Sequence, residues 1–532
     1  MCLRVLPRIA LLLFVLSMFW VCFPAGASAA DGGASSVLFL NDGGYLPGEL
    51  HGSDDPKVLR WRSPCFAQPF EFPMTAVKAV QYPAPGPQPK PVGEYCFELV
   101  NDDVLYGNVL RWTGDEVALE SVRIGRVHLR REQIRRFYLW KGADAIYLGP
   151  NGLAGWTDSA ATPHWRDEGG QLVTDQPGAS LYGALGIPEK AMIEVELSWK
   201  GAPDFVLALG VEDREAAVSN AFHLEVWDGE LVVVGESARD ADVASIQPVG
   251  TGEGHVRLQI YLDQAQQRLH LLSRGGKPLA TLHVDAKNGP IHPGVRLTNK
   301  KGDVRLEHLR ITSWNGLPPR EIREEQSRLH RTDGSIVYGQ ITGFDPDSKQ
   351  FTFRDGKTET RIEQAAILDV FLAPSVAVAK APADTAAGSP KGTVRAVYRD
   401  GWRISGTLTR IEDTHLTLNS PGVKEPLRLP LAGLRSLIAL NSPGGTASIP
   451  AVAGRAGRME MEGVHLNGRL VKGTEQPDGS CLVWHPELAL NASPLLPGES
   501  GRIVYRDPPQ PKPSVPEGQR TVIMQGGARV IL

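Results

Sequence analysis

A pair of glycines five residues apart recurs along this chain and limits what it can fold into. An acidic or asparagine residue precedes the first member, and such a turn supplies positive φ at little steric cost. A glycine inside the next strand marks a bulge or a sharp bend, and short, sharply bent strands close a very small barrel. The five pairs are Gly43/Gly48, Asp102/Gly107, Gly334/Gly339, Gly401/Gly406 and Gly463/Gly468.

The repeats differ in detail. Asp102 takes the place of the first glycine in the second repeat, which predicts a wider turn there. The fifth repeat carries an insertion-like stretch at 485–500. The glycine spacing and the apolar alternation resemble the Sm-like and SH3-like small β-barrels. That resemblance implies a five-stranded, bent sheet in each repeat.

Composition and turn residues divide the chain into modules. The 57 glycines and 41 prolines, with two short helix candidates at 132–137 and 321–327, indicate short strands broken by turns. We therefore predict an all-β protein in which several small β-barrel repeats flank a central concanavalin A-like β-sandwich. The predicted ranges are a signal peptide at 1–29, barrel repeats at 36–83, 94–142, 326–374, 393–441 and 455–507, the sandwich at 143–315, a linker at 375–392 and a C-terminal strand at 519–532. This last strand is expected to pair with a barrel, and a frayed tail is the alternative.

The central segment has a different character from the repeats. Alternating apolar strands fill residues 143–315, which is typical of a two-sheet sandwich. Its opening, Gly155-Trp156, Trp165, Gly170 and Leu172, resembles the concanavalin A-like jelly rolls, in particular laminin-G-like domains and the 3-keto-disaccharide hydrolase-like domain family. The resemblance implies a fold that often binds sugars.

One hairpin in this segment carries the candidate ligand-binding residues. Asp228-Gly229 between two strand runs is a strong turn signal. Strand alternation places one imidazole, two carboxylates and one indole on the same face, where the ring could stack on a sugar and the polar groups could bind its hydroxyls. An ordinary solvent-facing strand is the alternative. The candidates are His223, Glu225, Trp227 and Glu230.

Carboxylates in the same segment raise the question of catalysis. Glu194 and Glu196 share a strand face, as the two carboxylates of a glycosidase can. Neither this pair nor the acidic residues of the hairpin match the E-x-D-x-(x)-E pattern of laminarinase-type enzymes. Paired glutamates on an exposed strand face are most often only solvated charge, so we predict a solvated face at Glu194 and Glu196 and no catalytic residue. The alternative is a carbohydrate-active, glycoside hydrolase-like enzyme with its site in the sandwich.

The N-terminal residues predict the compartment. Arg4 and Arg8 precede an apolar run at 9–23 and the small residues AGASAA, which is the pattern of a cleaved secretory signal. No later segment is apolar and long enough to cross a bilayer. We expect an exported protein that is periplasmic, cell-surface or secreted, with no transmembrane segment after cleavage.

Charge and cysteine usage exclude several classes. Cleavage moves the net charge from −4 to −6 by removing two arginines, which favours no nucleic-acid partner. The six arginines within 123–136 indicate either a solvated face or an edge on which a partner docks. A disulfide between Cys65 and Cys96 is one alternative that the sequence allows. No metal-ligand spacing or nucleotide fingerprint occurs, so neither metal nor cofactor is expected.

These observations favour a non-catalytic modular binding or scaffold protein of the cell envelope. Its partner is predicted to be a glycan or an envelope protein, recognised through the central sandwich. A purely structural array, with barrels that assemble edge to edge between chains, is the remaining alternative.

Overall fold

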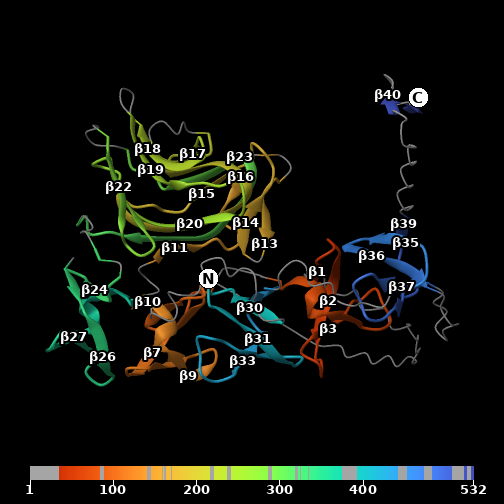
Figure 1. Cartoon of the computed structure of the whole chain (residues 1–532), viewed down its shortest axis with the longest axis horizontal. Coiled ribbons are helices and arrows are strands. Elements are labelled where there is room, and N and C mark those ends of the chain that lie inside the picture. The colour runs from red at the N-terminus through yellow and green to blue at the C-terminus, as the bar shows by residue number, and fades with distance from the viewer. Residues whose placement is uncertain are drawn as a thin grey trace, which may run out of the picture. The chain divides into compact units, whose positions relative to one another are not determined.

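The computed structural model describes most of the chain after residue 34, and its elements are β-strands and short 3-10 turns (Figure 1). The all-β prediction is confirmed. Within this part of the chain, no helix is long and apolar enough to cross a membrane. The described residues are 35–83, 89–140, 145–158, 160, 163–168, 170–215, 221–236, 241–284, 290–317, 322–323, 325–333, 335–373, 392–440, 452–471, 482–505, 521–523 and 529–531.

Each glycine-pair repeat consists of short antiparallel strands in one order. In the first repeat that order is β5–β1–β2–β3–β4, and the other repeats follow it. The strands of the first three repeats are β1 (Ser36–Leu40), β2 (Tyr45–His51), β3 (Val58–Arg62), β4 (Phe70–Pro73) and β5 (Val77–Gln81); β6 (Tyr95–Leu99), β7 (Val104–Trp112), β8 (Glu116–Ser121), β9 (Gly125–Arg130) and β10 (Ile134–Leu139); and β24 (Arg328–Arg331), β25 (Ile336–Tyr338), β26 (Gln340–Asp345), β27 (Gln350–Asp355), β28 (Thr358–Glu363) and β29 (Ile367–Phe371). Those of the last two are β30 (Thr393–Tyr398), β31 (Arg403–Ile411), β32 (His415–Asn419), β33 (Leu427–Pro430) and β34 (Leu434–Ala439); and β35 (Ala456–Met461), β36 (Val464–Val471), β37 (Val483–Pro486), β38 (Ser493–Pro494) and β39 (Gly501–Tyr505).

The first turn of a repeat has the same backbone with or without glycine. In the fourth repeat the Tyr398 N–H donates to the Trp402 carbonyl at 2.8 Å, and Gly401 has a φ of 84°. In the second repeat the Leu99 N–H donates to the Asp103 carbonyl at 2.9 Å, and Asp102 has a φ of 67°. The wider turn predicted for the second repeat is therefore wrong. Asp102 adopts the left-handed conformation, which costs a non-glycine residue about 1 kcal/mol.

The second glycine of each pair lies where a strand bends over its neighbour. A Cβ on Gly406 would meet the Asn419 carbonyl oxygen at 2.6 Å, and one on Gly107 would meet the Glu120 carbonyl oxygen at 2.5 Å. The same close approach to a carbonyl of the next strand occurs at Gly48, Gly339 and Gly468. The bend that the spacing predicts is thus produced by backbone packing that leaves no room for a side chain.

Strands of different repeats also pair with each other. The last strand β5 of the first repeat pairs with β34 of the fourth, and β10 of the second repeat pairs with β29 of the third. Single pairings join β2 with β36 and β31 with β7. These contacts are edge to edge, as the array alternative predicts, but they lie within one chain. They satisfy exposed strand edges that would otherwise invite aggregation.

The central sandwich has two sheets that share two long, bent strands, β16 (Lys190–Val211) and β23 (Gly294–Ser313), whose register shifts near Lys200–Asp204. Sheet A combines residues 190–200 and 303–313 of these strands with β22, β21, β20, β11, β14 and β13. Sheet B combines residues 204–211 and 294–301 with β19, β18, β17, β15 and β12. Apolar side chains from both sheets form one core, and Figure 1 shows β17–β19 in one layer and β20 and β11 in the other. The other strands are β11 (Ala145–Gly149), β12 (Thr157–Asp158), β13 (Arg166–Glu168), β14 (Gln171–Thr174), β15 (Ser180–Ala184), β17 (Phe222–Trp227), β18 (Glu230–Glu236), β19 (Ala241–Pro248), β20 (Gly254–Asp263), β21 (Arg268–Ser273) and β22 (Pro278–His283).

Several local predictions need correction. The helix predicted at 132–137 is a 3-10 turn, Arg131–Gln133, followed by β10, because Ile134 and Phe137 are buried against the repeat core. The described residues of the second helix candidate, 322–323 and 325–327, are not helical. At the C-terminus β40 (Thr521–Ile523) pairs with β41 (Arg529–Ile531) instead of with a barrel. Cys65 and Cys96 are both buried and unbridged. The predicted signal peptide and most of the linker at 375–392 lie outside the described residues.

Candidate functional site

The residues selected from the sequence lie on the outer face of sheet B, around the hairpin of β17 and β18. Asp228 and Gly229 form its turn with φ values of 49° and 81°, and Trp227 pairs with Glu230 across it. The hairpin is therefore the one that the Asp-Gly signal predicts. The residues of this hairpin that enter the sandwich core are Phe222, Leu224, Leu231 and Val233.

A chain of contacts fixes the Trp227 ring. Its indole N–H donates to Glu225 Oε2 at 2.7 Å. The same carboxylate oxygen lies 3.5 Å from Lys300 Nζ, and Glu225 Oε1 lies 3.5 Å from His223 Nε2. His223 is only 3% exposed, and its Nδ1 lies 3.0 Å from the Ala221 carbonyl oxygen. The imidazole therefore supports Glu225 from within the sheet and does not face solvent.

Trp227 differs from every other described tryptophan in its exposure. It is 42% exposed, whereas Trp314 is partly buried and the remaining described tryptophans are buried. Glu230, beside it, accepts a hydrogen bond from Ser245 at 2.7 Å. A rigid indole plane with charged groups beside it is thus open to a ligand. We call this surface the Trp227 face, formed by Glu225, Trp227, Glu230 and Lys300 and supported by the buried His223.

The outer face of sheet A is covered, contrary to the expectation for its glutamates. Glu194 and Glu196 alternate with core residues along β16, and both are buried. Arginines from the repeats and from neighbouring strands surround them. Arg136 of β10 lies 2.6 Å from Glu194, and Arg257 of β20 lies 2.7 Å from Glu196. The solvated strand face predicted for these residues is therefore wrong.

Asp102 connects the turn of the second repeat to this face. Its two carboxylate oxygens accept hydrogen bonds from Arg257, each 2.6 Å long. Arg274, which follows β21, donates to Asp102 at 2.9 Å and to Glu98 at 2.8 Å. The bidentate geometry to Arg257 is the strongest form of such a contact. An ion-pair network thus holds the second repeat against the sandwich.

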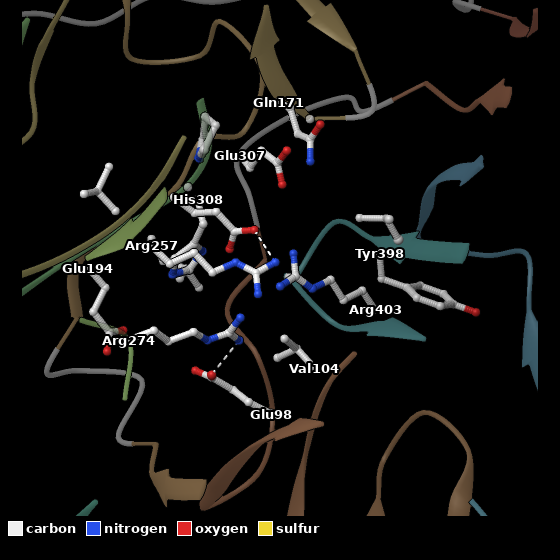
Figure 2. A pocket seen from close by; sticks show the side chains of 18 of the residues that line it. Glu98, Val104, Gln171, Glu194, Arg257, Arg274, Glu307, His308, Tyr398 and Arg403 are labelled. Carbon is white, nitrogen blue, oxygen red and sulfur yellow. Dashed lines mark hydrogen bonds and ion pairs between the residues drawn. The ribbon is translucent and has the colours of Figure 1, made fainter. Parts of the chain in front are cut away.

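A cavity of about 150 Å³ lies where sheet A meets the second and fourth repeats. Figure 2 shows its charged lining, with Arg257, Arg274 and His308 from the sandwich and Arg403 from β31. Seven arginines and four glutamates line it, among hydrophobic and tyrosine side chains. We call this space the junction cavity. Its charged lining residues are Glu98, Arg136, Glu194, Glu196, Arg257, Arg274, Glu307, Arg395, Arg399, Arg403 and Arg435.

The pKa values of the glutamates in the junction cavity are shifted in opposite directions. Burial raises the pKa of Glu194, but the charges of Arg136 and Arg310 outweigh it and lower the pKa to about 2. The pKa of Glu307, in contrast, is raised, because it is buried and lies near ionised Glu196. Glu307 also accepts a hydrogen bond from Ser198. The cavity therefore holds strongly ionised carboxylates beside one that protonates more readily.

Some arginines of the stretch at 123–136 contact the sandwich network or the fourth repeat. Arg135 and Arg136 contribute to the network around Glu98. Arg123 lies over the Tyr398 ring, 3.7 Å from its centroid, and pairs with Asp400 of the fourth repeat at 2.6 Å. These residues form docking contacts within the chain, which is one of the two alternatives that the sequence left open.

The carboxylates considered for catalysis do not meet in one place. Glu194 and Glu196 face the junction cavity, whereas Glu225 lies on sheet B, on the opposite outer face of the sandwich. Within the described residues, no group of three or more His, Cys, Asp or Glu side chains is placed to hold a metal ion. The carboxylates of the hairpin and the pair Glu194 and Glu196 therefore lie on two separate faces of the sandwich.

The described residues define an all-β protein in which ion pairs join a two-sheet sandwich to bent, glycine-paired repeats. No protein-family model matches this chain, and no curated protein does. Solved structures are similar to this chain only at low identity and low TM-score. The carbohydrate-binding module CBM66 from Bacillus subtilis is 12% identical, with a TM-score of 0.24, over 30% of this chain and 96% of that module. The CBM2 module of the evolved Dit of Lactobacillus casei BL23 phage J-1 is 10% identical, with a TM-score of 0.24, over 35% of this chain and 98% of that one. The CBM40 of the Ruminococcus gnavus IT-sialidase, bound to α2,6 sialyllactose, is 14% identical, with a TM-score of 0.19, over 25% of this chain and 80% of that one.

Proposed function

We propose that this chain is an exported, non-catalytic modular binding protein of the cell envelope that recognises a glycan through the Trp227 face. One observation carries the proposal. Trp227 is the only exposed tryptophan among the described residues, and a hydrogen bond to Glu225 fixes its ring. A fixed ring loses little conformational freedom when a ligand binds, so most of the contact energy is retained.

The chemistry of the face fits a neutral or weakly charged sugar. An indole offers a flat apolar surface on which the C–H groups of a sugar ring can pack. Glu225 and Lys300 beside it supply an acceptor and a donor for hydroxyl groups. A flat ring with a few polar groups placed around it provides both the apolar contact and the orienting hydrogen bonds that small-molecule recognition uses.

The N-terminal residues support the proposed export, and the repeats support the proposed scaffold role. The secretory pattern within residues 1–29 would deliver the chain outside the cytoplasm. The repeats, joined edge to edge within the chain, would serve as the scaffold that presents the sandwich. An envelope protein is the other partner that such a surface could take.

Retention on immobilised polysaccharides tests the proposal with the full chain. Trp227→Ala should remove most retention and leave the melting temperature within about 1 °C, because the side chain is exposed. Trp227→Phe should retain part of the binding, since a smaller ring remains. Val243→Ala is the matched control, because Val243 is 40% exposed on a neighbouring strand of the same sheet.

Two results would reject a glycan site at this face. One is equal retention of wild type and Trp227→Ala on every polysaccharide that binds the chain. The other is that no polysaccharide binds, while an envelope protein is captured by wild type and by Trp227→Ala alike.

A further inference from the structure

The junction cavity contains an arginine that has neither a hydrogen bond nor an ion pair among the described residues, although its charge acts on Glu196 from farther away. Arg403 begins β31 in the fourth repeat, and its guanidinium forms neither a hydrogen bond nor an ion pair within 4 Å with any described residue. Its Nε is buried without a hydrogen-bond partner. A buried donor of this kind costs about 1–3 kcal/mol when it is unsatisfied. A ligand that accepts a hydrogen bond from this guanidinium would remove that cost.

Neighbouring arginines make the contrast sharper. Arg136, Arg257, Arg274 and Arg435 all line the cavity, and each has a carboxylate partner within 4 Å. Arg403 lacks one although it faces the same space. These four guanidinium groups are thus paired directly, whereas Arg403 has only the more distant charge of Glu196 opposite it.

The unpaired guanidinium points toward other positive charges. Figure 2 shows the Arg403 and Arg257 guanidinium groups turned toward one another inside the cavity. Arg395, on the adjacent strand β30, donates to the Ser405 hydroxyl and to the Asn101 carbonyl, and has no ion pair within 4 Å among the described residues. Burial lowers the pKa of Arg395, and the charge of Arg403 lowers it further. Like charges that converge around a small space are stabilised when an anion occupies it.

We propose that the junction cavity binds a small oxyanion, a carboxylate, sulfate or phosphate group, through Arg403 together with Arg257 and Arg395. Planar guanidinium groups match the geometry of these oxyanions. The cavity of about 150 Å³ has room for one such small group. The site is separate from the Trp227 face, which lies on the other sheet, and it does not depend on glycan binding there.

Calorimetric titration of the full chain at constant ionic strength tests this site. The probes are inorganic sulfate, inorganic phosphate and galacturonate, with galactose and sodium chloride as neutral-sugar and salt controls. At least one of the three oxyanions should bind, whereas galactose and chloride should not. A response to galacturonate alone would identify a sugar acid as the source, and a response to sulfate or phosphate would identify a free or esterified tetrahedral anion.

Arg403→Gln should weaken oxyanion binding about tenfold or more, because one charge-assisted contact is lost. Arg410→Gln, on the same strand but with a side chain that is 71% exposed, is the matched control and should bind as wild type does. The melting temperature of Arg403→Gln without ligand should stay close to that of wild type, since no hydrogen bond is lost and the attraction to Glu196 that is removed is offset by the relief of repulsion from Arg395.

Three results would overturn the assignment. The first is that none of the three oxyanions binds at up to tens of millimolar. The second is an unchanged affinity in Arg403→Gln. The third is a lower melting temperature for ligand-free Arg403→Gln, which would show that Arg403 has a structural role within the chain.

Discussion

The carboxylate of Asp102 accepts two hydrogen bonds, each 2.6 Å long, from the guanidinium of Arg257 on strand β20. Asp102 occupies the turn position that glycine takes in the first, fourth and fifth repeats. The one non-glycine residue at this position is therefore also one of the residues that join its repeat to the sandwich, together with Glu98 and Arg136. Its left-handed backbone is maintained because the side chain compensates with buried contacts.

Replacing this residue with the repeat glycine separates backbone strain from ion pairing. Asp102→Gly relieves about 1 kcal/mol of backbone strain. It also removes a partner of Arg257 and Arg274, and breaking such a pair costs about 3–5 kcal/mol. We expect a net loss of about 2–4 kcal/mol in the free energy of unfolding, measured by chemical denaturation.

Two further variants control this measurement. Asp115→Gly places the same substitution at an exposed turn of the same repeat and should have a small effect. Arg257→Gln combined with Asp102→Gly should cost less than the sum of the single changes, because the two residues share one interaction. A more stable Asp102→Gly protein would refute the stabilising role of the pair.

The features that the sequence predicts correctly are local. Asp228-Gly229 and the alternation around it predict the hairpin and which of its residues enter the core, since both depend only on adjacent residues. The glycine spacing predicts the strand bends for the same reason. Even at Asp102, the local pattern predicts that a turn forms there, although not its type.

The junction cavity could not be predicted in this way. Alternation places Glu194 and Glu196 on one strand face, but it does not tell what covers that face. Their partners come from strands that are far away in the sequence, such as β10 and β31. The available signal was the departure of Asp102 from the glycine pattern, together with charged residues at positions that alternate with core residues on β16 and β20.

A side chain at the second glycine of a repeat should disrupt the bend. In Gly406→Ala the new Cβ would lie 2.6 Å from the Asn419 carbonyl oxygen, which is backbone and cannot move aside cheaply. We expect a loss of more than about 2 kcal/mol in the free energy of unfolding. The control is Gly343→Ala in β26, where the nearest atom, Thr352 Oγ1, would be 3.5 Å away. Equal stabilities of the two variants would contradict the packing explanation.

The hydrogen bond from Trp227 to Glu225 should contribute to glycan affinity by fixing the ring, in addition to the contact that Glu225 makes with sugar hydroxyl groups. Glu225→Ala frees the indole, so binding must then immobilise it at a cost of about 0.5–1.5 kcal/mol. Polysaccharide affinity should fall several-fold, and less than in Trp227→Ala. Glu253→Ala removes a glutamate whose side chain is 78% exposed and that pairs with Lys200, and it should leave affinity unchanged. An affinity of Glu225→Ala equal to that of wild type would show that ring fixation is unimportant.

Asp103, next to the turn residue, should make stability depend on pH. It is fully buried, and its Oδ2 accepts a hydrogen bond from Asn101 at 2.7 Å. Burial raises its pKa from 3.8 to about 6, although Ser405 and Arg395 oppose the shift. An acid whose pKa is raised by folding stabilises the fold fully below its unfolded pKa. That contribution is lost as the pH rises toward 6.

Asp103→Asn removes this titration and keeps an oxygen that can accept from Asn101. The stability of wild type relative to Asp103→Asn should therefore fall between about pH 4 and pH 6 and stay level above it, by about 2–3 kcal/mol in total. Thermal unfolding of both proteins across pH 3.5–8 measures the difference, and Asp115→Asn, at an exposed carboxylate of the same repeat, controls for the loss of one charge. If the gap between wild type and Asp103→Asn does not change over this range, the carboxyl of Asp103 ionises equally well in the folded and unfolded chain, and its burial carries no electrostatic cost.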